Sequence, residues 1–390
     1  MSSKPRFVGK RVKLGDVCTI VSGATPKTKT NEYWGGEIRW VTPAELDGDS
    51  HYISDTEKHL TEAGYKSASL RMMPKGTVLL TTRAPIGKVA IAAEEMSCNQ
   101  GFKNLVCSSA INNEFLYLYL KSRTAELQAM GRGATFKELS KKNVAGFEIN
   151  LPAIDRQLDA VAKLTAVRSQ IALAKQQHDQ LDSLVKSRFV EMFASGGFPT
   201  VSFGDACLRV NNGITRRGND PDGDIVLRLV ELQEGFIDYA KPNRIRLTQK
   251  EKERFSLVDG DLLFARVNGN PKSVGRCASF SAINESVYHN DHVIRATFDH
   301  SKYNPEFLVF FMNSSKGRAQ IKAAITTSAG QYTINQAGIK SIQVPLPPLT
   351  LQQEFATFVS QVDKSRFIAQ QQIEKLQMLY DSLAQDYFGD

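Results

Sequence analysis

Two stretches of the chain carry many side chains that can hydrogen-bond to bases and phosphates, placed in loops rich in Gly, Thr and Asn. In residues 1–152 they are Lys27, Lys29, Tyr33, Trp34, Arg83, Lys88, Asn99, Gln100, Lys103, Arg132, Thr135 and Lys137. In residues 196–347 they are Arg216, Arg217, Arg266, Asn268, Asn270, Lys272, Arg276, His289, His292, Gln331, Tyr332 and Asn335. Arg and Lys suit guanine edges and phosphates, and Asn and Gln suit adenine edges. We predict nucleic-acid contacts for these loops as a group, although any single loop lysine can equally be solvated, and Trp34 can belong to a core.

The side-chain patterns of common enzymes are missing from the sequence. There is no G-x-x-x-x-G-K-[ST] phosphate loop, and "GRGATF" from Gly131 holds only the first half of a dinucleotide-binding fingerprint. The Asn/Asp-Pro-Pro-aromatic motif of amino-methyltransferases and the Glu-x-Lys tripeptide of many metal-dependent nucleases do not occur. "HNDH" (His289 to His292) has no third ligand nearby. We therefore predict a binding protein with no catalytic residues and no bound metal.

The distribution of charge supports a polyanionic partner. The formal net charge is +8. Residues 1–152 contain 21 basic and 15 acidic residues, and residues 196–347 contain 19 and 15, whereas residues 348–390 contain 3 and 6. The excess positive charge thus lies in the two loop-rich segments, as in proteins that bind nucleic acid. Charge alone does not decide the matter, because many basic proteins bind no nucleic acid.

Composition and cysteine usage are those of a globular protein of the cytoplasm. The chain is 42% hydrophobic and 23% charged, and no apolar run approaches the ~18 residues of a membrane helix. The basic N-terminus has no apolar stretch of the kind found in secretory signals. The five cysteines are widely spaced without a C-x-x-C pair, so we expect reduced thiols.

The chain repeats itself at half its length. "LPAIDRQLDAVAKL" from Leu151 and "LPPLTLQQEFATFV" from Leu346 lie 195 residues apart. "KLGDVCTIVSGATP" also resembles "SFGDACLRVNNGIT", and "PKGTVLLTTRAPIGKVAI" resembles "VDGDLLFARVNGNPKSVGRCA". A duplicated globule followed by a duplicated helix is the simplest interpretation.

Each long Pro- and Gly-free segment carries a heptad pattern of apolar residues. Besides His178 and Tyr380, the predicted seam consists of Leu164, Val167, Ile171, Ala174, Leu181 and Val185 in the first segment, and of Val359, Val362, Ala369, Ile373, Leu376 and Leu383 in the second. Such a seam favours a coiled coil, and the small Ala174 and Ala369 allow close approach. Two separate amphipathic helices, each packed on its own globule, are the alternative.

These patterns predict an α+β protein with an internal pseudo-two-fold repeat. We expect two similar mixed α/β domains, residues 1–152 and 196–347, separated by two long helices, residues 153–195 and 348–390, that form an antiparallel coiled coil. A 39-residue helix is about 58 Å long. It would therefore hold the domains apart over fewer than ~17 base pairs of duplex DNA.

In these features the chain resembles the specificity subunit of type I restriction–modification systems over nearly its whole length. The residues that carry the resemblance are "LP…QQEF" with its heptads, the weaker "LP…DRQLDAV", "TTRAPIGKVAI", "NQGFKN" and "GATFKEL". In the second copy "ARVNGNPKSVGRCA" and "YHNDHVI" replace the third and fourth of these strings. Divergence of this kind is expected if the two halves read different sequences.

The resemblance implies a division of labour between subunits. Each target-recognition domain would read one half of a bipartite sequence in double-stranded DNA, and the coiled coil would set the gap. Two modification subunits would bind S-adenosylmethionine and methylate adenine. Restriction subunits, which use ATP and Mg²⁺, would translocate and cut. This chain would itself bind no cofactor.

Three other functions remain open at the level of sequence. The chain could be a coiled-coil scaffold that spaces two protein-binding domains, with its basic charge incidental. It could be an enzyme with an unrecognised site, although unlike loop residues on a repeated fold argue against a shared catalytic set. It could bind RNA, but no aromatic pattern typical of an RNA-binding sheet occurs.

Overall fold

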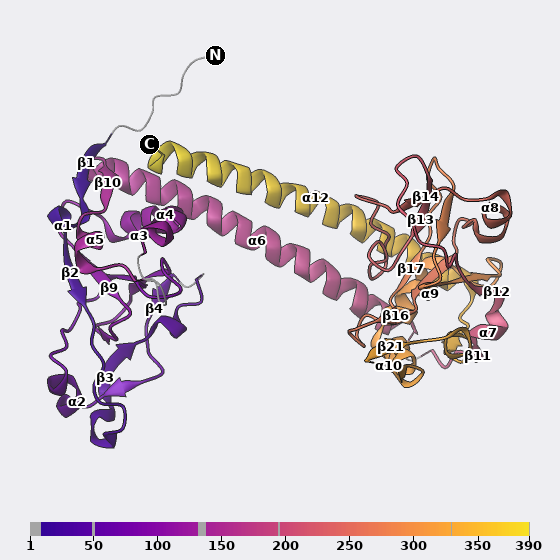
Figure 1. Cartoon of the computed structure of the whole chain (residues 1–390), viewed down its shortest axis with the longest axis horizontal. Coiled ribbons are helices and arrows are strands. Elements are labelled where there is room, and N and C mark those ends of the chain that lie inside the picture. Colours follow the sequence, from indigo (N-terminus) through magenta and orange to yellow (C-terminus); the bar gives the residue numbers. More distant parts are fainter. Residues whose placement is uncertain (1–8, 49–50, 132–137, 194–195, 329, 390) are drawn as a thin grey trace, which may run out of the picture. The chain divides into compact units, whose positions relative to one another are not determined.

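The computed structural model describes residues 9–48, 51–131, 138–193, 196–328 and 330–389. The chain divides into two compact units: unit 1 comprises residues 1–176 and 370–390, and unit 2 comprises residues 177–369. Each unit contains one loop-rich domain and part of each of the long helices α6 (Ile154–Phe193) and α12 (Leu349–Phe388) (Figure 1). The two helices lie within the predicted helical segments, but both units share them.

The described residues of the unit 1 domain form three small sheets. The five-stranded sheet has the order β2-β9-β6-β7-β4, with strands Cys18–Ser22, Lys103–Cys107, Val78–Leu80, Val89–Ala92 and Tyr52–Ile53. The three-stranded sheet has the order β5-β3-β8, with strands His59–Leu60, Trp34–Val41 and Ser97–Cys98. Strands β1 (Lys10–Lys13) and β10 (Glu148–Leu151) pair antiparallel. The helices are α1 (Leu14–Val17), α2 (Glu62–Ser67), α3 (Asn113–Ser122), α4 (Thr124–Met130) and α5 (Lys141–Ala145), with 3-10 turns at Asn31–Tyr33 and Pro43–Glu45.

The domain of unit 2 has corresponding sheets. The four-stranded sheet has the order β12-β19-β15-β17, with strands Cys207–Asn212, Val293–Phe298, Leu262–Ala265 and Cys277–Ser279. The three-stranded sheets are β14-β13-β18, with strands Arg244–Ile245, Asp224–Leu227 and Val287–His289, and β16-β21-β20, with strands Val267–Asn268, Gln331–Thr333 and Thr326–Ser328. Strands β11 (Thr200–Ser202) and β22 (Gln343–Pro345) pair antiparallel. The helices are α7 (Phe203–Ala206), α8 (Gln249–Phe255), α9 (Pro305–Asn313), α10 (Ser315–Ala323) and α11 (Gln336–Lys340).

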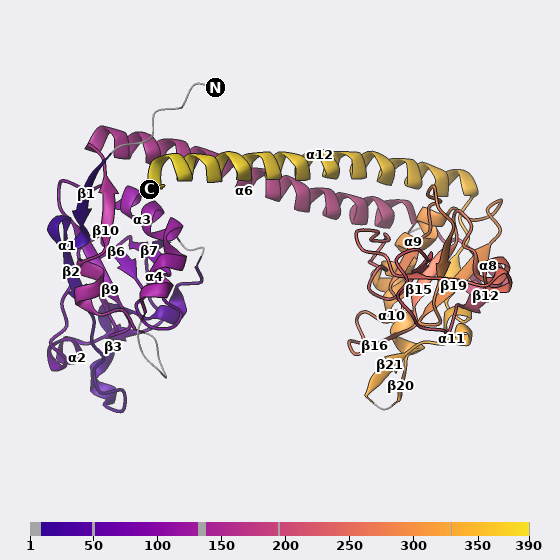
Figure 2. The same cartoon turned by 45° about the horizontal axis from the view of Figure 1, so that its top comes forward.

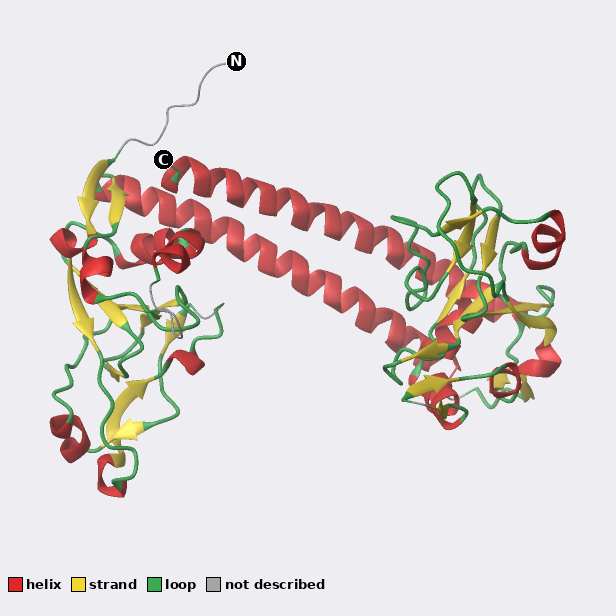
Figure 3. Ribbon diagram, viewed as in Figure 1, coloured by secondary structure: helices red, strands yellow, loops and turns green. Residues whose placement is uncertain are grey.

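The two domains share one topology, which confirms the predicted α+β repeat. Strands β2-β9-β6-β7 of unit 1 correspond in order to β12-β19-β15-β17 of unit 2, and β5-β3-β8 corresponds to β14-β13-β18. In both three-stranded sheets the central strand pairs antiparallel with one neighbour and parallel with the other. Figure 3 shows these short strands joined by long loops in each unit. Among the described residues, strand β4 of unit 1 is the main difference. At the place of β16 and β21, unit 1 has an antiparallel bridge between Arg83 and Glu138.

One buried helix in each domain connects its sheet to the long helices. In α3 all six residues from 115 to 120 are buried, and Phe388 at the end of α12 packs against Phe115 with ring centroids 5.5 Å apart. In unit 2, Phe193 at the end of α6 packs in the same way against Phe307 of α9, at 4.8 Å. Phe193 and Phe388 are 195 residues apart. The repeat thus extends to the way in which the helix ends dock.

Within unit 2 the parts of α6 and α12 run antiparallel. Arg188 pairs with Glu354, with Nη2 and Oε1 3.0 Å apart, and Asp182 pairs with Arg366, with Oδ1 and Nη2 2.5 Å apart. In unit 1 the Tyr387 hydroxyl donates to Asp159 Oδ2 at 3.1 Å, as an antiparallel pair requires. Figure 2 shows the end of α12 beside the first turns of α6 in this unit. Among the predicted seam residues, Leu164, Val167, Ile171, Ala174, Val185 and Val362 are buried, and Leu181, Val359, Ala369, Ile373, Leu376 and Leu383 are half-buried.

In the part of the chain that the structure describes, no helix combines the length and apolarity that a membrane span needs. All five cysteines are free thiols.

Candidate nucleic-acid interface

The predicted contact loops converge on the same backbone frame in both domains. Four backbone hydrogen bonds, made by loops to one another and to strand ends, define this frame in unit 1, and four in unit 2 match them one for one. In unit 1 the donor–acceptor pairs are Ala24–Cys98 (3.0 Å), Asn99–Val41 (3.1 Å), Thr82–Gly101 (2.7 Å) and Leu139–Thr82 (2.9 Å). In unit 2 they are Ile214–His289 (2.9 Å), Asn290–Leu227 (2.9 Å), Arg266–His292 (2.8 Å) and Ile334–Arg266 (2.9 Å). The loops that the sequence singled out are thus brought together in each unit.

A glycine in each copy makes the frame possible. A Cβ atom on Gly23 would lie 1.9 Å from the carbonyl oxygen of Asn99, and one on Gly213 would lie 1.9 Å from that of His289. No side chain can occupy such a position without moving the opposite loop. This explains why glycine recurs in "VSGATP" and "NNGIT".

In unit 1 a carboxylate organises the basic side chains of the frame. Glu138 accepts a hydrogen bond from Arg83 Nε at 3.0 Å, and its other oxygen lies 3.6 Å from Lys103 Nζ. The Lys103 side chain is only 11% exposed, whereas that of Arg83 is 47% exposed. Glu138 therefore neutralises the buried lysine and holds the exposed arginine in place.

Other predicted residues of unit 1 differ in their exposure to solvent and in whether their side chains are already hydrogen-bonded. Lys27 and Lys29 are exposed, and Asn99 is half-buried, with its side chain accepting from Gly101 N at 2.8 Å. Gln100 is exposed and accepts a hydrogen bond from the Thr25 hydroxyl, and Lys88 Nζ donates to the carbonyl of Leu46. Tyr33 and Trp34 are half-buried; Trp34 packs edge-on against Trp40 at 5.0 Å and so belongs partly to the core. Arg132, Thr135 and Lys137 lie outside the described residues.

In unit 2 Asp291, at the frame position that Gln100 holds in unit 1, contacts two arginines. Arg217 Nη1 lies 2.7 Å from Asp291 Oδ1, and Arg217 Nη2 lies 3.1 Å from His292 Nε2. Arg266 Nη1 donates to the Asp291 carbonyl at 3.1 Å. Asn268 faces Tyr332 across strands β16 and β21. The Asp291 carboxylate thus holds Arg217, and its backbone carbonyl holds Arg266. Asn270, Lys272 and Gln331 are exposed.

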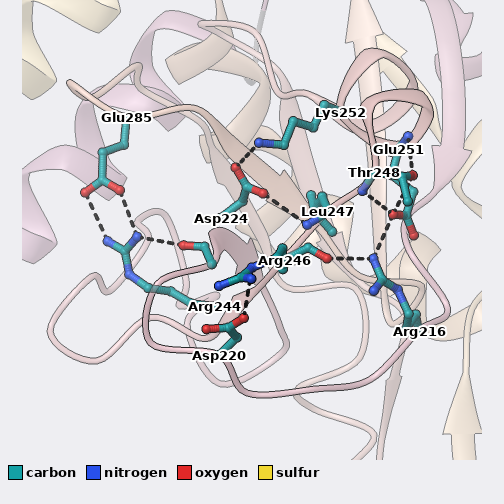
Figure 4. A network of polar contacts seen from close by, with 11 residues as sticks. Arg216, Asp220, Asp224, Arg244, Arg246, Leu247, Thr248, Glu251, Lys252 and Glu285 are labelled. Carbon is teal, nitrogen blue, oxygen red and sulfur yellow. Dashed lines mark hydrogen bonds and ion pairs between the residues drawn. The ribbon is translucent and has the colours of Figure 1, made fainter.

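Some predicted residues of unit 2 are engaged elsewhere. Arg216 donates to Glu251 Oε2 at 2.7 Å and to the Arg246 carbonyl at 2.9 Å. It belongs to the network of Figure 4, in which Arg244 also pairs with Glu285 at 2.9 and 3.0 Å, and Lys252 with Asp224 at 2.7 Å. Hydrogen bonds from Thr248 and the nearby Arg216 lower the pKa of Glu251, and Arg244 lowers that of Glu285. The charges of this network are therefore balanced within the chain.

Three more residues have structural roles that the sequence did not reveal. Arg276 donates to Gln233 Oε1 at 3.3 Å and to the Leu229 carbonyl at 3.4 Å. Asn335 caps α11 by accepting from Gly338 N at 2.8 Å. His289 is fully buried, so in this fold it is a core residue and the predicted DNA contact does not fit its position. The hydrogen bonds align Arg266 with Thr82, as do the strings "PKGTVLLTTR" and "VDGDLLFARV" when they are aligned without gaps.

The structure adds Arg228 and Glu231 to the residues beside the frame. Glu231 is 3% exposed and accepts from Arg228 N at 2.7 Å and from Arg228 Nη2 at 2.6 Å. Glu45 occupies the matching turn of unit 1 and accepts from Thr42 N at 2.6 Å. The strings "VTPAEL" and "LRLVEL" carry this signal as a Glu-Leu pair four residues after the strand, which sequence analysis overlooked.

Burial makes His289 a source of pH dependence. Its pKa is lowered to about 4, chiefly by burial, while Nδ1 lies 3.1 Å from the Val293 carbonyl. Above pH 6.5 the imidazole is neutral in both states. Below that pH the unfolded chain binds a proton that the folded chain accepts only near pH 4, so stability is lost as the pH falls through this window. The loss is at most about 3 kcal/mol.

We expect His289→Asn, which keeps a donor for Val293, to remove this component. Urea unfolding of both proteins at pH 7.5 and pH 5 measures it, because other titrating groups contribute equally to both. An identical drop in wild type and variant would contradict the assignment.

The repeated topology, the paired long helices and the shared loop frame define an internally duplicated two-domain protein. The profile described as "Type I restriction modification DNA specificity domain" matches residues 10–183 and 223–378. The chain belongs to this family.

Curated relatives and solved structures agree with this assignment. The chain is 38% identical over 184 residues to the type I restriction enzyme MjaIX specificity subunit of Methanocaldococcus jannaschii, covering 46% of this chain and 43% of the relative. It is 25% identical over 277 residues to the StySPI specificity subunit of Salmonella potsdam, covering 67% and 60%. The matched regions thus span about half the length of these relatives.

The fold itself matches over the full chain. A chain from a structure titled for complex assembly and conformational transition of the type I R-M system has a TM-score of 0.64 at 17% identity, covering 100% of both chains. The type I restriction–modification S subunit from M. genitalium has a TM-score of 0.58 at 11% identity, covering 100% of this chain and 98% of that one. At these identities the likeness establishes the fold.

Proposed function

We propose that this chain is the non-catalytic DNA specificity subunit of a type I restriction–modification complex. Each domain would read one half of a bipartite target in double-stranded DNA, and the paired helices would set the gap between the halves. Family membership and the duplicated fold support this proposal.

The main observation in support of this function is that both domains share one backbone frame but place different side chains on it. The frame positions held by Thr82, Gln100 and Gly101 in unit 1 are held by Arg266, Asp291 and His292 in unit 2. An enzyme with two copies of one site would place the same residue types on the same frame. Two readers of different sequences need the same backbone and different hydrogen-bonding groups.

The test is a genome-wide map of adenine methylation in the host with this gene present and deleted. Deletion is expected to abolish methylation of one bipartite motif and leave the rest unchanged. If the map does not change, DNA binding by the chain with its neighbouring gene products distinguishes a silent system from a scaffold. Binding through six phosphate contacts falls by about a thousand-fold between 50 and 200 mM salt, whereas a scaffold shows no salt-sensitive DNA binding.

Catalysis would belong to partner chains in the cytoplasm. Two modification subunits would bind S-adenosylmethionine and methylate adenine, and restriction subunits would use ATP and Mg²⁺. This chain would bind none of these cofactors. Its own contribution would be to select the DNA and hold the partners on it.

The long helices carry apolar residues suited to two equivalent partners. Leu173 and Ile368 are 195 residues apart and 59% and 63% exposed, and Leu184 and Leu379 are 195 residues apart and 48% and 47% exposed. Exposed apolar side chains at matching places of a repeat indicate contact surfaces. Because each occurs twice, they favour two copies of one partner, as the modification subunits would be.

We expect Leu173→Glu combined with Ile368→Glu to weaken binding of the modification subunits by about a hundred-fold, since a buried charge would replace two contact residues. Met378→Glu is the matched control: Met378 is 64% exposed, but its repeat partner is Ser183. Sedimentation of the assembled complex measures the effect. Equal weakening by the control would rule out these positions as the contact.

A further inference from the structure

A glutamine in the first turn of each long helix is completely buried. Gln157 of α6 and Gln352 of α12 are both 0% exposed and are 195 residues apart, so they occupy the same place in the repeat. A buried amide must have its hydrogen bonds satisfied, because leaving them unmade is costly. An apolar side chain could fill the space without that demand, so the amide has some other use.

In unit 1 the Gln157 side chain joins the helix to two other chain segments. Its Oε1 accepts from Asn112 N at 2.8 Å, and its Nε2 donates to the carbonyls of Ala110 at 3.0 Å and Pro152 at 2.8 Å. Asn112 is the N-cap of α3, where its own side chain accepts from Phe115 N at 3.0 Å. One amide therefore connects the start of α6, the end of β10 and the start of the buried helix α3.

In unit 2 Gln352 makes the same three bonds. Its Oε1 accepts from Asn304 N at 2.9 Å, and its Nε2 donates to the carbonyls of Lys302 and Pro347, both at 2.9 Å. Asn304 caps α9 by accepting from Phe307 N at 3.2 Å. The two sites agree in every partner by position, although the surrounding sequences differ.

These hydrogen bonds are directional, so they constrain the orientation of the helix start more than the apolar packing beside it does. The apolar contacts between the long helices and the domain helices, such as Phe388 on Phe115, fix the orientation less strictly, because the hydrophobic effect is non-directional. Three hydrogen bonds from one planar amide to three backbone groups fix both the position and the rotation of the helix start. Both amide hydrogens are used, so no shorter or apolar side chain can replace the set.

We propose that Gln157 and Gln352 are positioning residues that fix the angle of each recognition domain on its long helix and thereby decide how strictly the gap between half-sites is read. This inference rests on the proposed function. Both glutamines are fully buried, so neither can reach DNA and select bases. Loss of either amide lets its domain swing on the helix, which widens the range of gaps accepted and leaves both half-sites unchanged.

The experiment uses the full chain assembled with its modification subunits. The variants are Gln157→Met and Gln352→Met, which keep side-chain volume and lose the amide. Gln170→Met on α6 and Gln353→Met on α12 are matched controls, because both of these glutamines are exposed. Binding is measured to DNA duplexes that carry the two half-sites of the methylation map, with the gap shortened or lengthened in single base-pair steps.

The wild type and both controls are expected to prefer one gap strongly. In each Met variant the preference over a gap one base pair longer or shorter falls by about tenfold, while single-letter changes in either half-site still abolish binding. If a Met variant does not fold, Gln157→Asn and Gln352→Asn replace it. Asn keeps an amide on a side chain too short to make all three hydrogen bonds, so the same loss of gap preference is expected.

Two results would overturn the proposal. If the variants bind all gaps equally less well and keep the wild-type preference, the glutamines contribute stability alone. If the controls lose the preference to the same extent, the effect does not come from the buried amides. A wild-type complex that binds no bipartite site, or shows no gap preference, overturns the proposed function itself and this inference with it.

Discussion

Insertion of seven residues after Gln176 and of another seven after Ala369 will lengthen the gap in the recognised DNA and leave both half-sites unchanged. These points coincide with the division between the two compact units, so each unit keeps its own contacts. Seven residues preserve the heptad seam and add about 10.5 Å of helix. At 3.4 Å per base pair this is about three base pairs. Because DNA also turns by a full circle in about 10.5 base pairs, the selected gap will be the one nearest this length that presents both half-sites to their domains.

The adenine-methylation map of cells carrying the altered gene gives the new gap directly. Two controls define the result. A seven-residue insertion in one helix alone leaves the other helix without matching seam residues, and three-residue insertions in both helices rotate the seam away from its partner. Both are expected to abolish methylation of any bipartite site. Altered half-site letters with an unchanged gap would contradict the role of the helices as a spacer.

The long helices and the repeat could be predicted from sequence because their signals are local and redundant. Forty-residue segments without Pro or Gly allow one structure, and every predicted seam residue is buried or half-buried. The strings around Gly23 and Gly213 align because a close backbone approach excludes every other residue at those places. The fold class thus followed from patterns that packing and backbone geometry impose directly.

The ion-pair partners and burial of individual basic residues could not be predicted, because they depend on carboxylates far away in the sequence. Arg216 and Arg217 are neighbours in one string, yet Arg216 pairs with Glu251 of α8 and Arg217 with Asp291 of another loop. Lys103 reads as a loop cation and is buried against Glu138. "YHNDH" reads as a polar loop, but every residue of β18 is buried, so His289 turns inward while His292 stays at the frame. Periodicity says which face of an element is apolar and says nothing about partners across loops.

Removal of the carboxylate of Asp261 is expected to destabilise the domain of unit 2 more than any loop substitution. Asp261 and Arg295 are 1% and 4% exposed, and Arg295 Nε lies 2.7 Å from Asp261 Oδ2. The carboxylate also accepts from Val258 N at 2.8 Å and from the Thr297 hydroxyl at 2.6 Å. Asp261→Ala leaves an arginine charge buried without its partner, which costs about 3–5 kcal/mol. Urea unfolding, followed through the hydrogen exchange of β15 and β19 amides, measures the loss.

A double-mutant cycle separates the ion pair from the packing around it. Arg295→Met alone leaves the carboxylate buried with two hydrogen bonds, and we expect a loss of similar size. Asp261→Leu combined with Arg295→Met removes both charges, and it should cost clearly less than the sum of the two single losses, because replacement of a buried pair by apolar groups is often nearly neutral. Additive losses would mean that the two groups are stabilised independently, Asp261 by Val258 and Thr297, and Arg295 by the Ser256 carbonyl, 2.8 Å from its Nη1.

The Arg217–Asp291 pair is the contrast: its arginine side chain is 54% exposed, so Arg217→Met should change stability by less than about 1 kcal/mol. The Arg217 substitution is expected to lower DNA affinity instead. In the second domain, DNA recognition would then depend on the exposed frame, and stability on the buried Asp261–Arg295 pair.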